Sequence, residues 1–204
     1  AFAIIPVFLL SLFKPDLQME NRIMPMDAPG NLSDGPYISY GPDKMYVKYI
    51  LDDTGVKKLK EDSMLLADKK KASLTVQTDI PGKTFSVVLK DKLVNEKAEH
   101  KKAARQLVIS DIEGQFGAFR KLLLASKVID DNFNWIFGDG HLVLAGDFFD
   151  RGDQVTEVLW LIYSLEEKAQ KAGGYVHFVL GNHEIMNMSA DLRYVHPKYI
   201  ENAG

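Results

Sequence analysis

The chain has 204 residues, of which 46% are hydrophobic and 26% are charged, and its formal net charge at pH 7 is −3. These values lie near the average of globular proteins and exclude a wholly disordered, collagen-like or polytopic membrane protein. The small net charge gives no sign of the basic surface that nucleic-acid-binding proteins carry, so no nucleic acid partner is expected. Because the sequence has no cysteine, disulfide scaffolds, zinc–thiolate sites and cysteine nucleophiles are excluded.

An uncharged apolar run, residues 1–13, opens the sequence and is followed by Lys14 and Pro15. A bilayer takes about 20 apolar residues to cross, so the run fits the apolar region of a signal peptide or the end of a membrane anchor. It predicts an exported, periplasmic or membrane-tethered protein, with a cytoplasmic location as the alternative. The first residue is not Met, and no helix or strand pattern closes the sequence at Gly204, so we expect a fragment or a processed product.

Two regions of different texture follow the apolar run. Proline and glycine interrupt residues 14–36 without a regular period, which indicates a linker. Residues 37–102 hold short β-rich runs and then a charged stretch, and we interpret them as a small β-rich accessory module with a connector. Lysines between residues 57 and 71 alternate with acidic residues, which is typical of a solvated face. The runs that favour strands are residues 37–40, 45–50, 73–78 and 84–89.

From residue 103 onward, expected strands alternate with expected helices. Apolar residues recur at helical spacing after residue 115 and again from Val155 to Leu165, and Gly173-Gly174 stops the second helix. This alternation is typical of βαβ units, so residues 103–204 are expected to form an α/β domain with a parallel sheet. The expected strands are residues 106–110, 141–145 and 175–180.

Each of these strands runs directly into a polar cluster. Right-handed crossovers bring the carboxyl ends of parallel strands to one edge of the sheet, where α/β folds bind ligands, so the clusters are expected to meet there. Any one cluster alone could be structural, since Asp, Asn and Gly are common turn and capping residues. The candidates are Asp111 and Glu113 after the first strand, Asp147, Asp150 and Arg151 after the second, and Asn182 and His183 after the third.

The residue types in these clusters favour metal-assisted phosphate chemistry. Carboxylates gathered at one edge repel one another unless a cation compensates their charge. Oxygen donors from Asp, Glu and Asn suit divalent ions such as Mn²⁺, Mg²⁺ or Fe²⁺. A guanidinium matches phosphate oxygens in a bidentate way, and an imidazole can donate a proton at neutral pH.

Taken in order, D-x-E-G, G-D-x-x-D-R-G and G-N-H-E between Gln106 and Glu184 resemble the signature of the calcineurin-like metallophosphoesterases, most closely the branch of the serine/threonine protein phosphatases and the symmetrical dinucleotide polyphosphate hydrolases. The resemblance implies a four-layer sandwich of sheets and helices with two divalent metal ions, of which Mn²⁺ is favoured and Fe, Mg²⁺ or Zn²⁺ is possible. It also implies roles for single residues. The metal ligands are then Asp111, Asp147 as the bridge, and Asn182, with His183 as the general acid oriented by Asp150, and Arg151 and Asn182 as the phosphate-binding residues.

Two departures from the family pattern stand out. Glu113 occupies the place of the histidine in the family's first motif, and as a metal ligand it would shift the preference towards harder ions; alternatively it faces away and starts a helix. The family's two late histidine ligands have no counterpart in this sequence. The chain is therefore expected to lack the carboxyl-terminal part of the domain and to be inactive by itself.

The expected function is hydrolysis of phosphomonoesters, with phosphoprotein as one candidate substrate. The reaction would use a water that two metals activate, in an exported or membrane-tethered enzyme of bacterial type. One alternative keeps the metals and makes the substrate a dinucleotide polyphosphate or a phosphodiester. The other is a non-catalytic binding module built on a phosphoesterase scaffold. The oligomeric state and the physiological substrate do not follow from the sequence.

Overall fold

The computed structural model describes residues 32–95, 97, 99–100 and 102–203. The apolar run of residues 1–13, for which export or tethering is expected, lies outside the described residues. Within the described ranges, no helix is long and apolar enough to cross a membrane.

The amino-terminal part forms two small antiparallel sheets. β1, β2 and β3 pair in this order, and β4 pairs with β5 across the predicted turn at Pro81-Gly82. The 3₁₀ helix η1 joins β3 to β4. The bounds are β1 Leu32–Tyr40, β2 Lys44–Asp53, β3 Val56–Leu65, η1 Leu66–Lys71, β4 Ser73–Gln77 and β5 Thr84–Val88.

Two features of this part differ from the expectation. β1 begins at Leu32, so residues 32–36 are strand and not linker; the Gly35-Pro36 pair that indicated a linker lies where the register between β1 and β2 is irregular. β3 was not predicted at all. No residue of this strand, which is described throughout, is buried, so the sequence there lacks the alternation of apolar and polar residues that reveals a half-buried strand.

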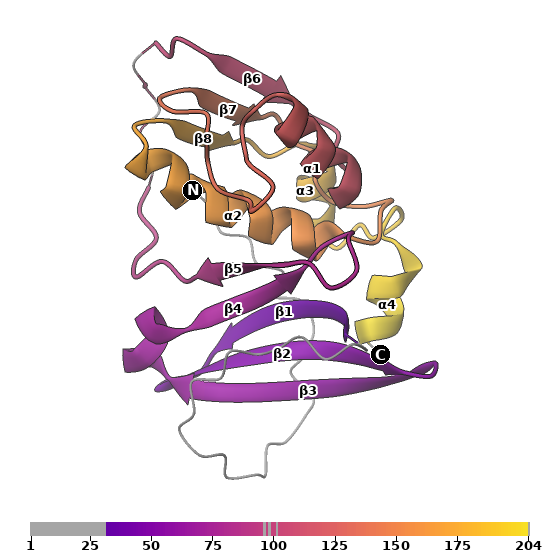
Figure 1. The fold of residues 1–204 in the computed structure, drawn as a ribbon. Helices are drawn as coiled ribbons and strands as arrows, with labels where there is room; N and C mark the ends of the chain where they lie inside the picture. Colours follow the sequence, from indigo (N-terminus) through magenta and orange to yellow (C-terminus); the bar gives the residue numbers. More distant parts are fainter. Residues whose placement is uncertain (1–31, 96, 98, 101, 204) are drawn as a thin grey trace.

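The carboxyl-terminal part has the predicted βαβαβ order, with three parallel strands arranged β6-β7-β8. Since each strand is added on the same side of the previous one, right-handed crossovers place both connecting helices on one face of the sheet, as Figure 1 shows. The bounds are β6 Gln106–Ile109, α1 Phe116–Ala125, β7 His141–Leu144, α2 Val155–Lys171, β8 Tyr175–Phe178, α3 Asn182–Met188 and α4 Pro197–Ala203.

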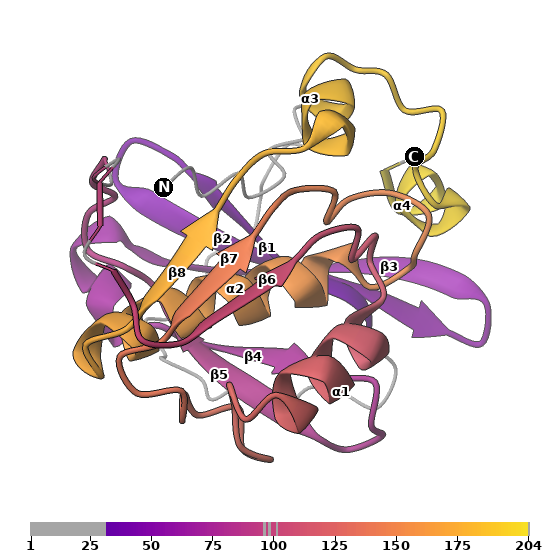
Figure 2. The same cartoon turned by 90° about the horizontal axis from the view of Figure 1, so that it is seen from above.

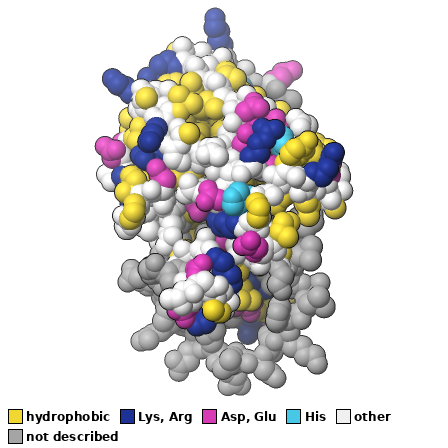
Figure 3. All heavy atoms as spheres, turned by 90° about the vertical axis from the view of Figure 1, so that its right-hand side faces the viewer, with side chains coloured by type: hydrophobic (Ala, Val, Ile, Leu, Met, Phe, Trp, Pro, Cys, Tyr) yellow, Lys and Arg dark blue, Asp and Glu magenta, His cyan; other side chains and the backbone are white. Residues whose placement is uncertain are grey.

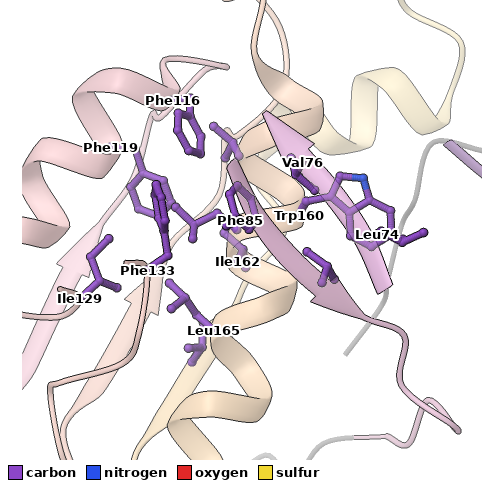
Figure 4. Packing of buried hydrophobic residues seen from close by; sticks show 14 of the residues in the cluster. Leu74, Val76, Phe85, Phe116, Phe119, Ile129, Phe133, Trp160, Ile162 and Leu165 are labelled. Carbon is purple, nitrogen blue, oxygen red and sulfur yellow. The ribbon is translucent and has the colours of Figure 1, made fainter. Parts of the chain in front are cut away.

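A single hydrophobic core joins the two parts. α2 lies between the β6–β8 sheet and the β4–β5 pair (Figure 1), and Phe85 of β5 packs on Phe133, with ring centroids 5.1 Å apart (Figure 4). The indole Nε1 of Trp160 donates a hydrogen bond of 2.9 Å to the carbonyl of Pro36. All these side chains belong to one buried cluster except Pro36. The boundary predicted near residue 103 is therefore not a boundary of the core.

A buried polar cluster lies where β1, α2 and α4 meet. Its centre is the carboxylate of Asp34, whose residue is only 2% exposed. Oδ2 of Asp34 accepts hydrogen bonds from the Tyr37 hydroxyl at 2.6 Å and from Asn202 Nδ2 at 2.9 Å. Nζ of Lys198 lies 3.5 Å from Oδ1 of the same carboxylate. The cluster thus ties the last described helix to the first strand.

Glu157 of α2 belongs to the same cluster and is also buried. Burial raises the pKa of its carboxyl to about 7. Two nearby charges have weaker effects: Lys198 lowers this pKa and Asp34 raises it. Its Oε2 is buried and has no hydrogen-bond partner in the described part of the chain. An ionised Glu157 is therefore costly in the folded protein.

Substitution of Glu157 with Gln should make the protein more stable in alkaline solution. The folded pKa lies above the ordinary value of 4.5, so the stabilising contribution of protonated Glu157 is complete below about pH 4.5 and is lost as the pH rises to about 7. The loss amounts to about 3 kcal/mol at most. Urea unfolding should show the Glu157→Gln variant to be more stable than the wild type at pH 8 and similar to it at pH 4.5.

The matched control is Glu167→Gln on the same helix, where the exposed carboxylate pairs only with Lys171 four residues on. It should change the free energy of unfolding by about 0.5 kcal/mol or less at either pH. Equal effects of the two substitutions at pH 8 would show that Glu157 is not buried as described.

Candidate active site

The three polar clusters meet at the carboxyl edge of the parallel sheet. Ile109, Leu144 and Phe178 end their strands side by side, with Ile109 opposite Leu144 and Leu144 opposite Phe178. We call the segments that follow the first loop (residues 110–115), the second loop (145–154) and the third loop (179–181). Figure 2 shows these strand ends pointing the same way, with α3 directly after β8.

Backbone hydrogen bonds join the first and second loops. The amide of Asp111 donates to the carbonyl of Gly146 at 3.1 Å, and the amide of Glu113 donates to the carbonyl of Asp147 at 3.0 Å. The second and third loops touch through glycine, because a Cβ on Gly146 would lie 2.5 Å from Cα of Gly181. A larger residue at either glycine would push the two loops apart.

Five of the predicted site residues have left-handed backbones. Their φ angles lie between 48° and 71°, although none of them is glycine. Each such conformation costs on the order of 1–3 kcal/mol and persists only where the surrounding structure enforces it. Strain of this kind gathers at functional sites. The five residues are Asp111, Glu113, Asp147, Asp150 and Arg151.

His183 and Asp150 form a buried pair. Nδ1 of His183 lies 2.6 Å from Oδ2 of Asp150, and the two side chains are 6% and 1% exposed. The second oxygen of Asp150 accepts a hydrogen bond of 2.8 Å from Nδ2 of Asn187. With Nδ1 engaged, Nε2 is the nitrogen of His183 that can face a substrate. This is the geometry of an oriented proton donor.

The predicted metal ligands differ in their position, exposure and partners. Asp147 lies at the centre, where its Oδ1 accepts a hydrogen bond of 3.0 Å from the amide of His183. Asp111 in the first loop and Asn182 at the start of α3 are both exposed. The side chain of Glu113 forms an ion pair with Arg151, so an expected metal ligand and an expected phosphate-binding residue bind each other.

Among the residues that the structure describes, no group of three or more His, Asp or Glu side chains is placed to hold one metal ion. The chemistry of the donors still fits a hard divalent ion, because Asp111, Asp147 and Asn182 offer oxygen atoms at one sheet edge. For Glu113, which was expected either to be a ligand or to start a helix, the structure shows an ion pair with Arg151 of the second loop.

Glu184, to which the sequence assigned no role, is the residue that holds the loops together. It is 1% exposed, and its two oxygens accept hydrogen bonds from four backbone amides at 2.7–3.2 Å. The donors are the amides of Asp147, Phe148, Phe149 and Gly181. The signal in the sequence is its place as the last residue of the G-N-H-E motif, directly after the general-acid candidate.

Tyr194 was also not predicted to belong to the site. It lies in the segment of residues 189–196, which we call the closing loop. Its ring centroid is 5.4 Å from that of His183, and the Arg151 guanidinium lies 5.9 Å from it. The amide of Arg151 donates to the carbonyl of Tyr194 at 2.9 Å. Figure 3 shows acidic, basic and histidine side chains side by side on the face of the molecule opposite the amino ends of the strands.

Comparison with known proteins places these residues in a family. Residues 104–203 match the model of the calcineurin-like phosphoesterases. Shewanella-like protein phosphatase 2 of Arabidopsis thaliana is 35% identical over 100 residues, which are 49% of this chain and 26% of that protein. Shewanella-like protein phosphatase 1 of Plasmodium berghei is 37% identical over 95 residues, which are 47% of this chain and 26% of that protein.

A solved structure resembles a larger part of the chain. The crystal structure of a cold-active protein tyrosine phosphatase of a psychrophilic Shewanella species is 35% identical, with a TM-score of 0.67, and the match covers 82% of this chain and 48% of that one. The likeness thus extends beyond residues 104–203 into the β-rich part. The chain spans about a quarter of the length of the curated relatives and about half of the solved chain.

Substitution of Glu184 with Gln should destabilise the protein. A Gln side chain carries no charge, and its NH₂ group would face backbone amides that also donate, which leaves buried donors unsatisfied at about 1–3 kcal/mol each. We expect the free energy of unfolding at pH 7 to fall by about 2–4 kcal/mol. The exposed Glu167→Gln change serves again as the control, and a loss below about 1 kcal/mol for Glu184→Gln would contradict its structural role.

Proposed function

We propose that this protein, whose residues 104–203 belong to the calcineurin-like phosphoesterase family, hydrolyses phosphomonoesters, including phosphoproteins, with the help of two divalent metal ions. The observation that carries the proposal is the buried pair of His183 and Asp150, 2.6 Å apart, at the sheet edge where the backbone of His183 also binds Asp147. A module that only binds its partner has no need of an oriented proton donor.

The oxygen atoms of Asp111, Asp147 and Asn182 are the groups that would hold the metals, with Mn²⁺ as the favoured ion. When bound, divalent metals neutralise charge on the phosphoryl oxygens and lower the pKa of a water that attacks phosphorus. The protein contributes to this step by holding these oxygen donors close together with the three loops.

Glu113 and Arg151 form an ion pair, and a substrate would give each of them a different partner. If the phosphate of a substrate takes the place of the carboxylate at Arg151, the guanidinium can bind two phosphate oxygens. The oxygens of Glu113 are then free to join those of Asp111. One exchange of partners would therefore prepare the phosphate site and complete the acidic donor set.

His183 would protonate the leaving oxygen through Nε2 as the ester bond breaks. Asp150 holds Nδ1 and stabilises the charged imidazole, and Asn187 holds the other oxygen of Asp150. Removing an oriented proton donor typically costs 10²–10⁴-fold in rate. No serine or cysteine nucleophile is required.

The choice of monoesters rests on the relatives, two of which bear the name protein phosphatase, while the solved relative is titled a protein tyrosine phosphatase. The direct test is turnover of aryl phosphate monoesters, aryl phosphate diesters and phosphopeptides by the full-length protein, with Mn²⁺ and with EDTA. We expect metal-dependent cleavage of the monoesters and phosphopeptides. Cleavage of diesters alone would favour the phosphodiesterase alternative, and no turnover of any ester would favour a binding module.

Substitution of Asp147 with Asn should abolish metal-dependent turnover and leave the fold intact, because Asn keeps the shape of the side chain but lacks the charge that binds a cation. Isothermal titration with Mn²⁺ should show weaker binding, and the thermal midpoint should stay within about 4 °C of the wild type. Full activity of Asp147→Asn would remove Asp147 from the mechanism.

Substitution of His183 with Gln should slow turnover by about 10²–10⁴-fold for alkyl phosphates, whose leaving oxygen needs a proton. The loss should be much smaller for p-nitrophenyl phosphate, whose leaving group departs without one. Asp150→Asn should give the same pattern, and the double variant should be no slower than His183→Gln alone. An equal loss on both substrates would contradict the role as general acid.

A further inference from the structure

α4 is held in place by polar contacts. None of its seven residues, all of which are described, is buried. Asn202 and Lys198 reach Asp34, and Nζ of Lys198 also donates to the carbonyl of Asp153 at 2.6 Å. The hydroxyl of Tyr199 accepts a hydrogen bond of 2.8 Å from the amide of Val155. The helix is therefore anchored at two places, at the buried carboxylate of Asp34 and at the backbone of Asp153 and Val155.

The closing loop runs directly into α4, which begins at Pro197. Near its end this loop places Tyr194 against His183 and Arg151. Tyr194 is 46% exposed, so packing around its own side chain fixes it only in part. Its position is set at one end by the carbonyl contact with the amide of Arg151 and at the other by α4.

We propose that Asp34 is a positioning residue of the candidate active site: it anchors α4, and through α4 it holds Tyr194 against His183 and Arg151. The proposal rests on the proposed function in taking His183 and Arg151 as the reacting and binding groups. It gives the β-rich part a role in catalysis, since Asp34 belongs to β1 and lies outside the residues that match the family.

The chemistry of the cluster suits an anchor. The Asp34 carboxylate is buried and collects three side-chain donors, of which Tyr37 is on its own strand and the other two, Asn202 and Lys198, come from α4. Truncating one member of such a network leaves the others buried and unpaired. Asn at position 34 would keep the shape of the side chain, remove the charge that faces Lys198, and turn an NH₂ group towards other donors.

The experiment compares Asp34→Asn with the wild type by residue-resolved amide exchange and by steady-state kinetics. Two amides report on the anchor: Arg151, which is bonded to Tyr194, and Val155, which is bonded to Tyr199. We expect both to exchange about tenfold faster. The amide of Val179, which donates to the carbonyl of Leu144 directly after β8, should keep its rate. On a monoester substrate, kcat/KM should fall by about tenfold or more, because a small displacement at a catalytic group is costly.

Two further variants separate positioning from folding. Asn202→Ala removes a contact on the α4 side only and should reproduce the exchange pattern even if Asp34→Asn does not fold. Asp52→Asn is the control, because it removes the same charge from the same sheet at an exposed pair with Lys57; exchange and kinetics should not change. Tyr194→Ala should lower kcat/KM, and adding Asp34→Asn to it should cause no further loss.

Additive losses in the double variant of Asp34 and Tyr194 would overturn the proposal, since Asp34 would then act by another route. Unchanged exchange at Arg151 and Val155 in both Asp34→Asn and Asn202→Ala would overturn it as well. So would equal acceleration at Val179, which would indicate general destabilisation. If the wild-type protein turned over no phosphoester, the proposed function would fail, while the exchange data would still decide whether Asp34 anchors Tyr194.

Discussion

The candidate site depends on one buried carboxylate. Glu184 binds four backbone amides, three from the second loop and one from the third. These bonds fix the path of the second loop, where the backbone conformation is strained. Asp147 and Asp150 have left-handed backbones in this loop, a conformation that L-residues avoid because of steric strain. Hydrogen bonds to a charged acceptor are stronger than those between neutral groups. The carboxylate can thus offset backbone strain in the second loop, so a residue of α3 orients the side chains of that loop.

The acidic residues of the site are kept together by partners that differ from one to the next. Asp150 is paired with His183, Glu113 with Arg151, and Asp147 accepts a backbone amide. These partners reduce the mutual repulsion between the carboxylates near this sheet edge. The Asp150 pair is buried and rigid, whereas Arg151 is exposed. A buried pair suits an orienting role, and a solvent-exposed ion pair contributes little to stability and exchanges easily. The two pairs therefore differ in the way that an orienter and a substrate-binding arginine should differ.

The sequence predicted the features that depend on short segments. The three parallel strands, the two crossover helices and the meeting of the polar loops follow from apolar runs and local periodicity, and the ends of β6, β7 and β8 lie within two residues of the expected ones. Features that depend on distant contacts were missed. β3 buries no residue, so its lysines looked like any solvated run. Residues 32–36 looked like a linker because of Gly35 and Pro36, yet Asp34 becomes buried through contacts with residues more than 160 positions away. Glu184 and Tyr194 act through backbone groups and ring contacts that no spacing rule reveals.

The shared core explains why a β-rich part accompanies this site. α2 begins directly after the second loop, and 11 of its 17 residues are buried, more than one face of a helix can provide. The sheet of β6, β7 and β8 covers one side of the helix, so a second layer must cover the opposite side. There Trp160 lies beside Leu74 and Val76 of β4 (Figure 4) and donates a hydrogen bond to Pro36 of β1. The β4–β5 pair supplies this layer, with Phe85 set against Phe116 and Phe133 from the βαβ part. Since the amino terminus of α2 carries the second loop, any shift of this layer would be passed to Asp147 and Asp150. The amino-terminal strands thus stabilise the geometry of the loops by packing against α2. The polar cluster around Asp34 adds a second connection, through α4.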